Sequence, residues 1–293
     1  MGSNIPRRLW LILFASILFS AAWMATAGRA RAETKPSPKF YLVGVGPGDA
    51  DLITLRAIKA IEQADVLFCH GRYGEKFGEY LEGKDVHYGF WRLFPYYGQD
   101  PADLEGDERE RCQRMAERRN EFIGVIRRAV DQGKTVAILD GGDPLIYGPH
   151  SWCLEEFEDL NPVVVPGVSC FNAANAALAR GITNSERTKS VILTAADWPG
   201  KTDTIDRLSV HQSTMVLFTM RTDFREFIDK LSVNLPPETP VAVVKHAGYA
   251  EREEVIQATL GTILDKVGGD RLPFEYLIYV GDFLTFRHKK NSG

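Results

Sequence analysis

The 293-residue sequence contains few of the residues that bind metals or form disulfide bonds. None of its six histidines stands in an H-x-x-x-H or H-x-x-E-H spacing. It has only four cysteines, and no two of them form a C-x-x-C pair: Cys69, Cys112, Cys153 and Cys170. These absences exclude a zinc site built on such a pair and argue against a disulfide framework or a metal hydrolase. We therefore expect no metal site.

The sequence also lacks an excess of positive charge. Lysine and arginine total 35 against 39 aspartates and glutamates, which gives a formal net charge of -4. A general nucleic-acid binder is normally basic, so we expect no nucleic-acid partner. Hydrophobic residues (44%) and charged residues (25%) are in ordinary globular proportions. At about 150 residues per domain, the length predicts about two domains.

Residues 1–39 differ in character from the rest of the chain. Arg7 and Arg8 precede an uncharged stretch, residues 9–28, which is long enough to span a bilayer as a helix. An A-x-A pattern at residues 30–32 then favours a cleaved secretory signal. The equally supported alternative is an uncleaved membrane anchor, for which flanking positive charges favour a cytoplasmic C-terminal part. We expect an exported or membrane-anchored protein whose folded part starts near Phe40.

The chain after residue 40 reads as an α/β protein in two halves. An apolar run at 40–45, helical spacing at 52–62 and a second run at 65–69 form a βαβ unit, which predicts a parallel sheet. Further strands are expected at 135–139 and 162–165, and helices at 107–130 and 168–179. After residue 183 the pattern restarts. A second, mixed sheet is predicted from strands at 190–194, 214–219, 241–245, 254–259 and 276–280, with helices at 224–231 and 260–267.

Two familiar motifs are incomplete in this chain. Residues 44–49 begin like a dinucleotide-binding fingerprint, but Asp49 stands where the third glycine belongs. Residues 167–171 resemble a nucleophile elbow, but Phe171 replaces its second glycine. A Rossmann dinucleotide site and a serine hydrolase are therefore disfavoured.

Three loops rich in glycine and proline stand out together. They are Gly-Val-Gly-Pro-Gly-Asp at 44–49, Gly-Gly-Asp-Pro-Leu-Ile-Tyr-Gly at 141–148 and Val-Pro-Gly-Val-Ser at 165–169. Each follows a predicted strand, where open α/β sheets bind their ligands. Glycine lets the backbone approach a ligand because it has no Cβ. The three loops predict a ligand site at one edge of the first sheet.

In this order the three loops resemble those of the tetrapyrrole (corrin/porphyrin) methylase family of S-adenosylmethionine-dependent enzymes. The resemblance extends over about residues 40–284. It implies two α/β domains, here 40–185 and 186–288, with the cofactor in the cleft between them. The implied activity is methyl transfer from S-adenosylmethionine to a small-molecule acceptor, a tetrapyrrole, by a chain that forms a homodimer. Because relatives methylate other acceptors, a peptide remains an alternative acceptor, and a non-catalytic tetrapyrrole- or cofactor-binding module remains an alternative function.

The resemblance also implies the residues that contact the cofactor. The matching positions are, in chain order, Pro47, Gly141, Gly142, Asp143, Ile146, Ser169, Cys170, Met220 and Ala247. The chain departs from uroporphyrinogen methylases, which have an acidic residue after the second strand and a lysine after the third. Here His70 stands at the first position, and Gly-Phe-Trp at 89–91 contains no lysine. His70 is therefore our candidate catalytic base, since imidazole titrates near neutral pH.

Residues 88–97 are unusually aromatic, with the sequence YGFWRLFPYY. The rings could form a platform that stacks on a flat macrocycle. They could equally pack the long charged helix at 107–130 onto its domain, and the sequence leaves both interpretations open.

Overall fold

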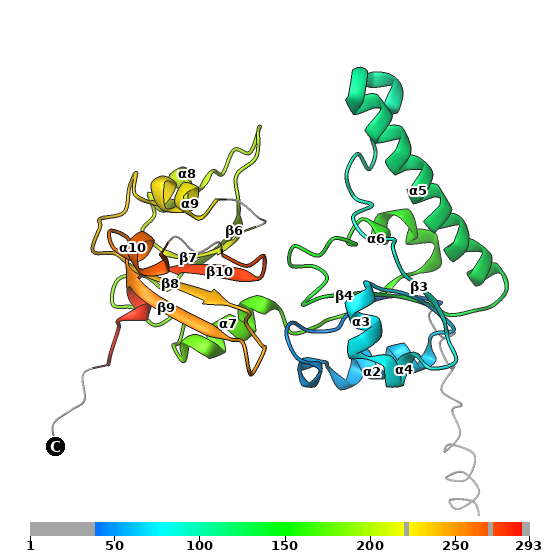
Figure 1. Ribbon diagram of the computed structural model, residues 1–293, viewed down its shortest axis with the longest axis horizontal. Coiled ribbons are helices and arrows are strands. Elements are labelled where there is room, and N and C mark those ends of the chain that lie inside the picture. Colours follow the sequence, from blue (N-terminus) through cyan, green and yellow to red (C-terminus); the bar gives the residue numbers. More distant parts are fainter. Residues whose placement is uncertain (1–38, 220–222, 269–271, 289–293) are drawn as a thin grey trace, which may run out of the picture. The chain divides into compact units, whose positions relative to one another are not determined.

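The structure is a computed structural model that describes residues 39–219, 223–268 and 272–288, the coloured parts of Figure 1. The signal or anchor segment predicted before residue 39 lies outside these residues, as does Met220. Within the described ranges, no helix has both the length and the apolar character needed to cross a membrane.

The first sheet has five strands, all parallel, in the order β3-β2-β4-β1-β5. The strands are β1 (Phe40–Gly44), β2 (Val66–Phe68), β3 (Asp85–His87), β4 (Val136–Asp140) and β5 (Val163–Val165). Every residue of β1, β2 and β4 is buried, as expected for a parallel sheet that is covered on both faces. The predicted parallel sheet is therefore confirmed.

Helices cover both faces of this sheet. On one face the core includes residues of α2 (Leu55–Gln63), α3 (Gly71–Lys76) and α4 (Gly78–Leu81). On the other face it includes residues of α5 (Gly106–Asp131) and α6 (Cys153–Glu156). Helix α2 begins after Thr54, whose Oγ1 accepts a hydrogen bond from the N–H of Ala57 at 3.1 Å.

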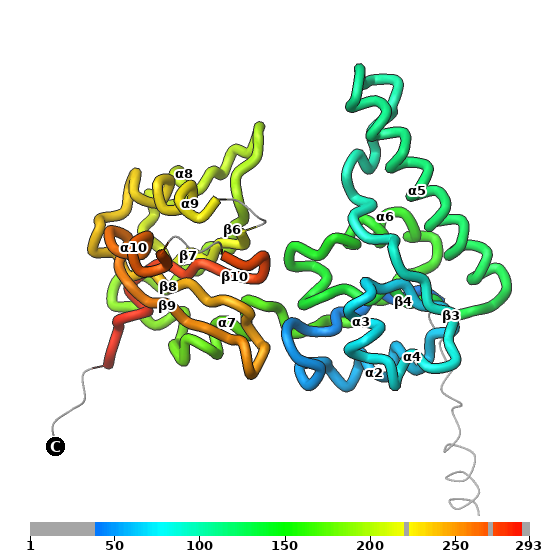
Figure 2. The backbone as a smooth tube through the Cα atoms, in the orientation of Figure 1, coloured from blue at the N-terminus to red at the C-terminus, as the bar shows by residue number. Residues whose placement is uncertain are grey.

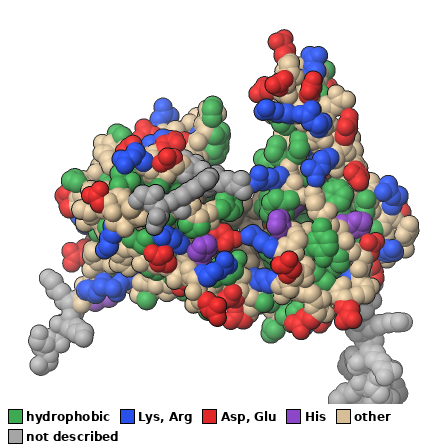
Figure 3. Space-filling model, viewed as in Figure 1, with side chains coloured by type: hydrophobic (Ala, Val, Ile, Leu, Met, Phe, Trp, Pro, Cys, Tyr) green, Lys and Arg blue, Asp and Glu red, His purple; other side chains and the backbone are tan. Residues whose placement is uncertain are grey.

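Helix α5 holds the aromatic segment 88–97 in place. The buried guanidinium of Arg119 donates hydrogen bonds to the carbonyls of Leu93, Pro95 and Tyr96, at 2.6, 3.1 and 3.2 Å. The Phe90 ring packs against Phe122 of α5 at 5.4 Å. Figure 3 shows positive and negative side chains interleaved along the exposed surface of α5, as a solvated helix face requires. Phe90 and the backbone of residues 93–96 therefore pack on α5, whereas Tyr88 and Phe94 are exposed.

The second sheet is mixed, as predicted, with the order β6-β7-β10-β8-β9. Only β6 and β7 pair in parallel, and the other neighbours are antiparallel. The strands are β6 (Val191–Ala195), β7 (Thr214–Phe218), β8 (Pro240–Lys245), β9 (Glu254–Thr259) and β10 (Tyr276–Val280). The described residues also form short 3-10 helices: η1 (Ala50–Leu52), η2 (Pro101–Asp103), η3 (Glu158–Leu160) and η4 (Asp282–Leu284).

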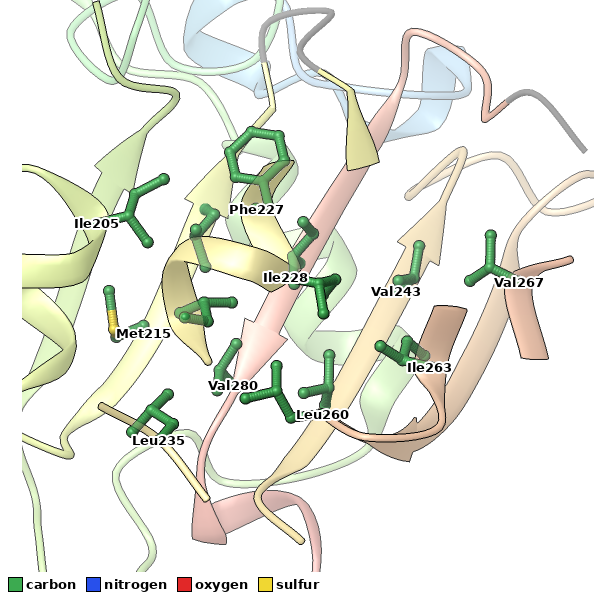
Figure 4. Packing of buried hydrophobic residues seen from close by; sticks show 14 of the residues in the cluster. Ile205, Met215, Phe227, Ile228, Leu235, Val243, Leu260, Ile263, Val267 and Val280 are labelled. Carbon is green, nitrogen blue, oxygen red and sulfur yellow. The ribbon is translucent and has the colours of Figure 1, made fainter. Parts of the chain in front are cut away.

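Three helices cover one face of the second sheet: α8 (Ile205–Ser209), α9 (Phe224–Leu231) and α10 (Ile263–Val267). In Figure 4, Phe227 and Ile228 project from α9 into the apolar layer that contains Val243 and Val280 of the strands. This layer forms a core of its own.

Helix α7 (Cys170–Leu178) packs on the opposite face of the second sheet (Figure 2). Its Ala174 and Leu178 are buried with Val244 of β8, and Tyr279 of β10 donates a hydrogen bond to the Phe171 carbonyl at 2.8 Å. The helix precedes the boundary that we predict at residue 185, although it packs against the second sheet. The domain limits themselves stay a prediction.

Candidate functional site

Strands β1 and β4 are neighbours in the first sheet, at the point where the strand order reverses. The chain passes from β1 to β2 on one side of this pair, and from β4 to β5 on the other. Their connections therefore leave in opposite directions, and a crevice is expected at the carboxyl ends of the two strands. The first two of the three predicted loops begin there.

The three loops touch one another through their backbones. The N–H of Gly46 donates to the Gly142 carbonyl at 3.3 Å, and the N–H of Gly142 donates to the Gly46 carbonyl at 3.1 Å. A Cβ atom on Gly167 would lie 2.1 Å from the Gly142 oxygen, and one on Gly44 would lie 2.6 Å from the Gly167 nitrogen. Only glycine fits these positions, so the loops form one unit.

A cavity of about 590 Å³ opens over this unit, a volume typical of small-molecule sites. Its walls come from the first two loops, from α3, and from strands β7, β8 and β10 of the second sheet. Apolar side chains alternate with a few polar ones, an arrangement that suits a ligand with both characters. The apolar lining includes Pro47, Trp91, Ile146, Phe218, Val244 and Leu277, and the polar lining includes Arg72, Tyr73, Lys76, Asp140 and Glu275.

A charged cluster joins α3 to the segment before β10 at this cavity. Arg72 Nη1 lies 2.7 Å from Glu275 Oε1, and Arg72 Nη2 donates to the Tyr73 hydroxyl at 3.3 Å. His246 Nδ1 is 3.5 Å from the other Glu275 oxygen. Burial lowers the pKa of Arg72, but Tyr73 and Glu275 raise it by more, so the guanidinium keeps its charge. The cluster places a permanent cation beside the cavity.

The first loop is also fastened to the loop after β8. A Cβ atom on Gly48 would lie 2.0 Å from the Gly248 oxygen, which shows how closely the two backbones approach. The N–H of Asp49 donates to that oxygen at 2.8 Å, and Asp49 Oδ2 accepts from the N–H of Ala250 at 2.8 Å. Lys76 Nζ donates to the Gly48 carbonyl, and burial lowers the pKa of this lysine.

Asp140, the last residue of β4, is one of the residues around the cavity, and its solvent-exposed fraction is 0%. Its Oδ1 accepts from the N–H of Gly141 at 3.1 Å, and its Oδ2 lies 3.4 Å from Nδ1 of the buried His150. The Trp91 ring packs edge-on against His150 at 4.9 Å and also lines the cavity. The aromatic segment 88–97 therefore reaches the site through Trp91 and its contact with His150.

The chain is similar to proteins of one known family. The model of the tetrapyrrole (corrin/porphyrin) methylases matches residues 39–264. The chain belongs to the tetrapyrrole methylase family. A cobalt-precorrin-4 C(11)-methyltransferase of Methanocaldococcus jannaschii is 33% identical, over 84% of this chain and 88% of that protein. A uroporphyrinogen-III C-methyltransferase of Priestia megaterium is 28% identical, over 85% and 99%.

A solved structure agrees with these relatives. That of a cobalt-precorrin-4 methyltransferase of cobalamin biosynthesis has a TM-score of 0.67 at 25% identity, covering 84% of this chain and 95% of that one. The predicted resemblance is confirmed, and this tetrapyrrole methylase is an S-adenosylmethionine-dependent methyltransferase.

The residues of the cavity fit S-adenosylmethionine as a cofactor. A Cβ atom on Gly141 would lie 2.1 Å from the Tyr73 hydroxyl, so the absence of a side chain keeps the second loop open there. Six of the predicted cofactor positions line the cavity: Pro47, Gly141, Gly142, Ile146, Cys170 and Ala247. Burial raises the pKa of Cys170, so this wall residue remains a neutral thiol.

Two other predicted positions support the loops instead of lining the cavity. Asp143 Oδ1 accepts from the N–H of Leu145 at 2.9 Å, which shapes the second loop. Ser169 is buried and caps α7, since its Oγ accepts from the N–H of Phe171 at 3.2 Å. Met220 lies outside the described residues. The cofactor contacts assigned to these three residues stay predictions.

His70, the predicted base, is exposed at the start of α3. Its Nδ1 accepts from the N–H of Arg72 at 3.3 Å, which is a capping contact. Burial and then the neighbouring Arg72 lower its pKa. Its ring packs against Trp91 at 5.4 Å, but His70 is not among the residues that line the cavity. Its catalytic role stays a prediction.

Sequence reasoning missed most of the polar lining. Arg72, Tyr73 and Lys76 follow the second strand directly, and their position at the carboxyl edge was the signal that could have found them. Asp140 ends the strand before the second loop and carried the same signal. Glu275 had none, because it arrives from the far end of the chain. In the described ranges, no three His, Cys, Asp or Glu side chains are grouped so that they could hold a metal ion.

Proposed function

We propose that this enzyme methylates a carbon atom of a corrin-type tetrapyrrole, as a precorrin-4 methyltransferase does. The observation that carries the proposal is the cavity, which unites the glycine-packed loops with the cations Arg72 and Lys76 and the ring of Trp91. Support also comes from relatives named as precorrin-4 or cobalt-precorrin-4 C(11)-methyltransferases, at 33%, 27% and 28% identity.

The cofactor part of the proposal rests on the loops. When bound, S-adenosylmethionine supplies a methyl group already activated on a sulfonium sulfur. Pro47, Gly141, Gly142, Ile146 and Ala247 would hold it, because they line the cavity where the backbones are fixed by mutual hydrogen bonds. The protein contributes mainly by orienting the two reactants and excluding water, which lowers the entropic part of the barrier.

The acceptor part rests on charge and shape. A corrin precursor is a flat macrocycle with several carboxylates. The guanidinium of Arg72 can bind a carboxylate through paired N–H donors, and the ammonium of Lys76 lies one helical turn further along α3. Trp91 offers an aromatic surface in the same cavity, which suits a macrocycle ring. These residues would orient the acceptor.

Uroporphyrinogen III is the second candidate acceptor, because a uroporphyrinogen-III C-methyltransferase also matches 85% of this chain. The sequence differs from those enzymes at His70 and at residues 89–91, where no lysine is present. We therefore rank the corrin precursor first, ahead of a peptide acceptor or a non-catalytic binding role.

The test has two stages on the full chain. Calorimetric titration with S-adenosylmethionine and S-adenosylhomocysteine should give one site with a Kd of about 1 μM or below, near −8 kcal/mol. Incubation with S-adenosylmethionine labelled in its methyl group should then label cobalt-precorrin-4 more rapidly than uroporphyrinogen III. Binding without transfer to either macrocycle would contradict the proposed acceptor class and favour a binding module.

We further propose that residues 1–39 direct the enzyme to a membrane, either as an anchor or as an export signal. The support is the uncharged stretch 9–28 with its flanking arginines. Cell fractionation with N-terminal sequencing distinguishes the two: a mature chain starting at Glu33 indicates export, and an intact chain in membranes indicates an anchor. The family resemblance also supports a homodimer, which sedimentation of the purified chain would test.

A further inference from the structure

The pair formed by Asp140 and His150 has a proton position that its hydrogen bonds leave open. Their side chains are 1% and 4% exposed, and Asp140 Oδ2 lies 3.4 Å from His150 Nδ1. Among the described residues, neither of these two atoms has a hydrogen-bond partner. A buried polar atom without a partner is costly, so an unmatched pair beside a cavity calls for a functional explanation.

The other ring nitrogen of His150 decides where protons can sit. Nε2 lies 3.4 Å from the carbonyl oxygen of Phe90, which can only accept. We therefore assign the proton of the neutral ring to Nε2, by hydrogen-bond accounting. Nδ1 is then an acceptor that faces the carboxylate oxygen of Asp140, another acceptor. One additional proton between the two atoms would complete a hydrogen bond.

We propose that Asp140 is the general base of the methyl transfer and that His150 positions it and shares the captured proton. This inference rests on the proposed function. As the methyl–sulfur bond breaks, its electron pair stays on sulfur, and a carbon of the acceptor supplies the pair for the new carbon–carbon bond. The acceptor then releases one proton at the cavity wall that Asp140 helps to form, and this proton is finally held between Asp140 Oδ2 and His150 Nδ1.

The surroundings favour capture of a proton by this pair. Tyr73 of α3 lines the same cavity, Cys153 of α6 lies near Asp140, and the Trp91 ring covers His150. Burial raises the pKa of the Tyr73 hydroxyl and of the Cys153 thiol, so both stay protonated and cannot compete as bases at neutral pH. The N–H of Gly141 holds the other carboxylate oxygen and so orients Oδ2 toward His150.

A first experiment tests the proton position in the protein alone. Nuclear magnetic resonance of the full chain with ¹⁵N-labelled histidine, assigned by difference from His150→Gln, should show protonation at Nε2 and a free Nδ1 at high pH. A ring protonated at Nδ1 at high pH would overturn the proposal, since the pair would already be satisfied.

A second experiment tests the role in catalysis with cobalt-precorrin-4 and uroporphyrinogen III as acceptors. Asp140→Asn should lower kcat by about 100-fold or more, the usual contribution of a general base, while KM and S-adenosylhomocysteine affinity change little. His150→Gln should lower kcat less and shift the acid limb of the pH profile, because a base must lose its own proton before it can act. The matched control Asp65→Asn, at the amino end of the same sheet, keeps the acceptor for the Thr135 N–H and should behave as wild type.

The outcomes separate the two proposals. If the wild-type chain methylates a macrocycle and Asp140→Asn is fully active, the base role is overturned and the proposed function stands. A wild-type chain that methylates neither macrocycle overturns the proposed function and the base role that rests on it. If Asp140→Asn does not fold, the pH profile of His150→Gln decides, and an unchanged profile counts against the pair.

Discussion

The two sheets contribute to the cavity in different ways. The first sheet supplies backbone: its three loops meet at Gly46, Gly142 and Gly167, where no side chain fits. It also supplies charge, through Asp140 and the helix that follows β2. The second sheet supplies mostly an apolar wall on one face, and on its other face it carries a core from which, among the described residues, Tyr276 alone lines the cavity.

This difference teaches where the enzyme tolerates change. A group whose position depends on touching backbones cannot move without moving its neighbours, whereas an apolar wall keeps its character under many substitutions. We therefore expect substitutions on the far face of the second sheet to affect stability alone. Substitutions in the glycine-packed loops should affect ligand affinity as well.

The largest effect is expected for Phe227→Ala, in the far core of the second sheet (Figure 4). Phe227 is 1% exposed, and loss of a buried phenylalanine costs about 3–5 kcal/mol of unfolding free energy. Denaturant unfolding should show this loss, and calorimetry should show an unchanged Kd for S-adenosylhomocysteine in the folded fraction. The control Val233→Ala, at an exposed position, should change stability by about 0.5 kcal/mol or less. A weakened Kd in Phe227→Ala would break the comparison.

Gly167→Ala should have a smaller effect on stability and a direct effect on the site. The new Cβ would lie 2.1 Å from the Gly142 oxygen, and the backbone shift that avoids this clash should cost about 1–3 kcal/mol of unfolding free energy. Because the second loop must shift, S-adenosylhomocysteine affinity should fall by about tenfold or more, equal to about 1.4 kcal/mol. Gly78→Ala is the matched control, since a Cβ there meets nothing within 4 Å. Equal affinities in the two variants would contradict the role of the loop unit.

The ion pair between Arg72 and Glu275 sharpens the comparison, because it connects the two halves. Its side chains are 46% and 30% exposed, so its removal in Arg72→Gln should cost about 1 kcal/mol of stability at most. The KM for the tetrapyrrole should nevertheless rise by about tenfold, since a cation for its carboxylates is lost. Arg114→Gln, which breaks the exposed pair with Glu110 on α5, should leave KM unchanged. An unchanged KM in Arg72→Gln would exclude this arginine from acceptor binding.

His70→Asn should have the smallest effect. Asparagine keeps a capping acceptor at the start of α3, so stability at neutral pH should change by about 0.5 kcal/mol or less. Burial and Arg72 lower the pKa of His70 in the folded state, so the unfolded chain binds the proton more tightly. The contribution of His70 is therefore fully present above the unfolded pKa of 6.5 and is lost as pH falls below it.

His70→Asn should accordingly flatten the acid-side fall in unfolding free energy just below pH 6.5. Chemical unfolding across that range, with turnover measured in parallel, checks both effects. Loss of turnover in this variant, with the cap intact, would restore His70 as the base and count against Asp140.

Much of the fold follows from patterns within single segments. The buried strands β1 and β4 and the amphipathic helix α9 were predictable because apolar runs and helical spacing decide them locally. Helices α3 and α4 were not, since three glycines in residues 71–78 weaken any helical signal. Strand β3 has only three residues at the sheet edge, too few for a periodic pattern.

The candidate site was predictable where it is made of backbone and unpredictable where it is made of pairs. The glycine loops could be recognised because each is rich in glycine or proline and directly follows a predicted strand. The partnership of Asp140 with His150 depends on how the second loop folds back, which no spacing rule contains. Glu275 meets Arg72 across 203 residues of chain, so only the finished fold reveals it.

The bond between Asp49 and Ala250 has a consequence for how the enzyme matures. The two residues are 201 positions apart, so the first loop reaches its final setting only when the chain beyond β8 is present. Contacts of such long separation form late in folding, because loop closure must precede them. During synthesis the ribosome must therefore release almost the whole protein before a competent binding site exists, and truncated products should retain no hold on the cofactor.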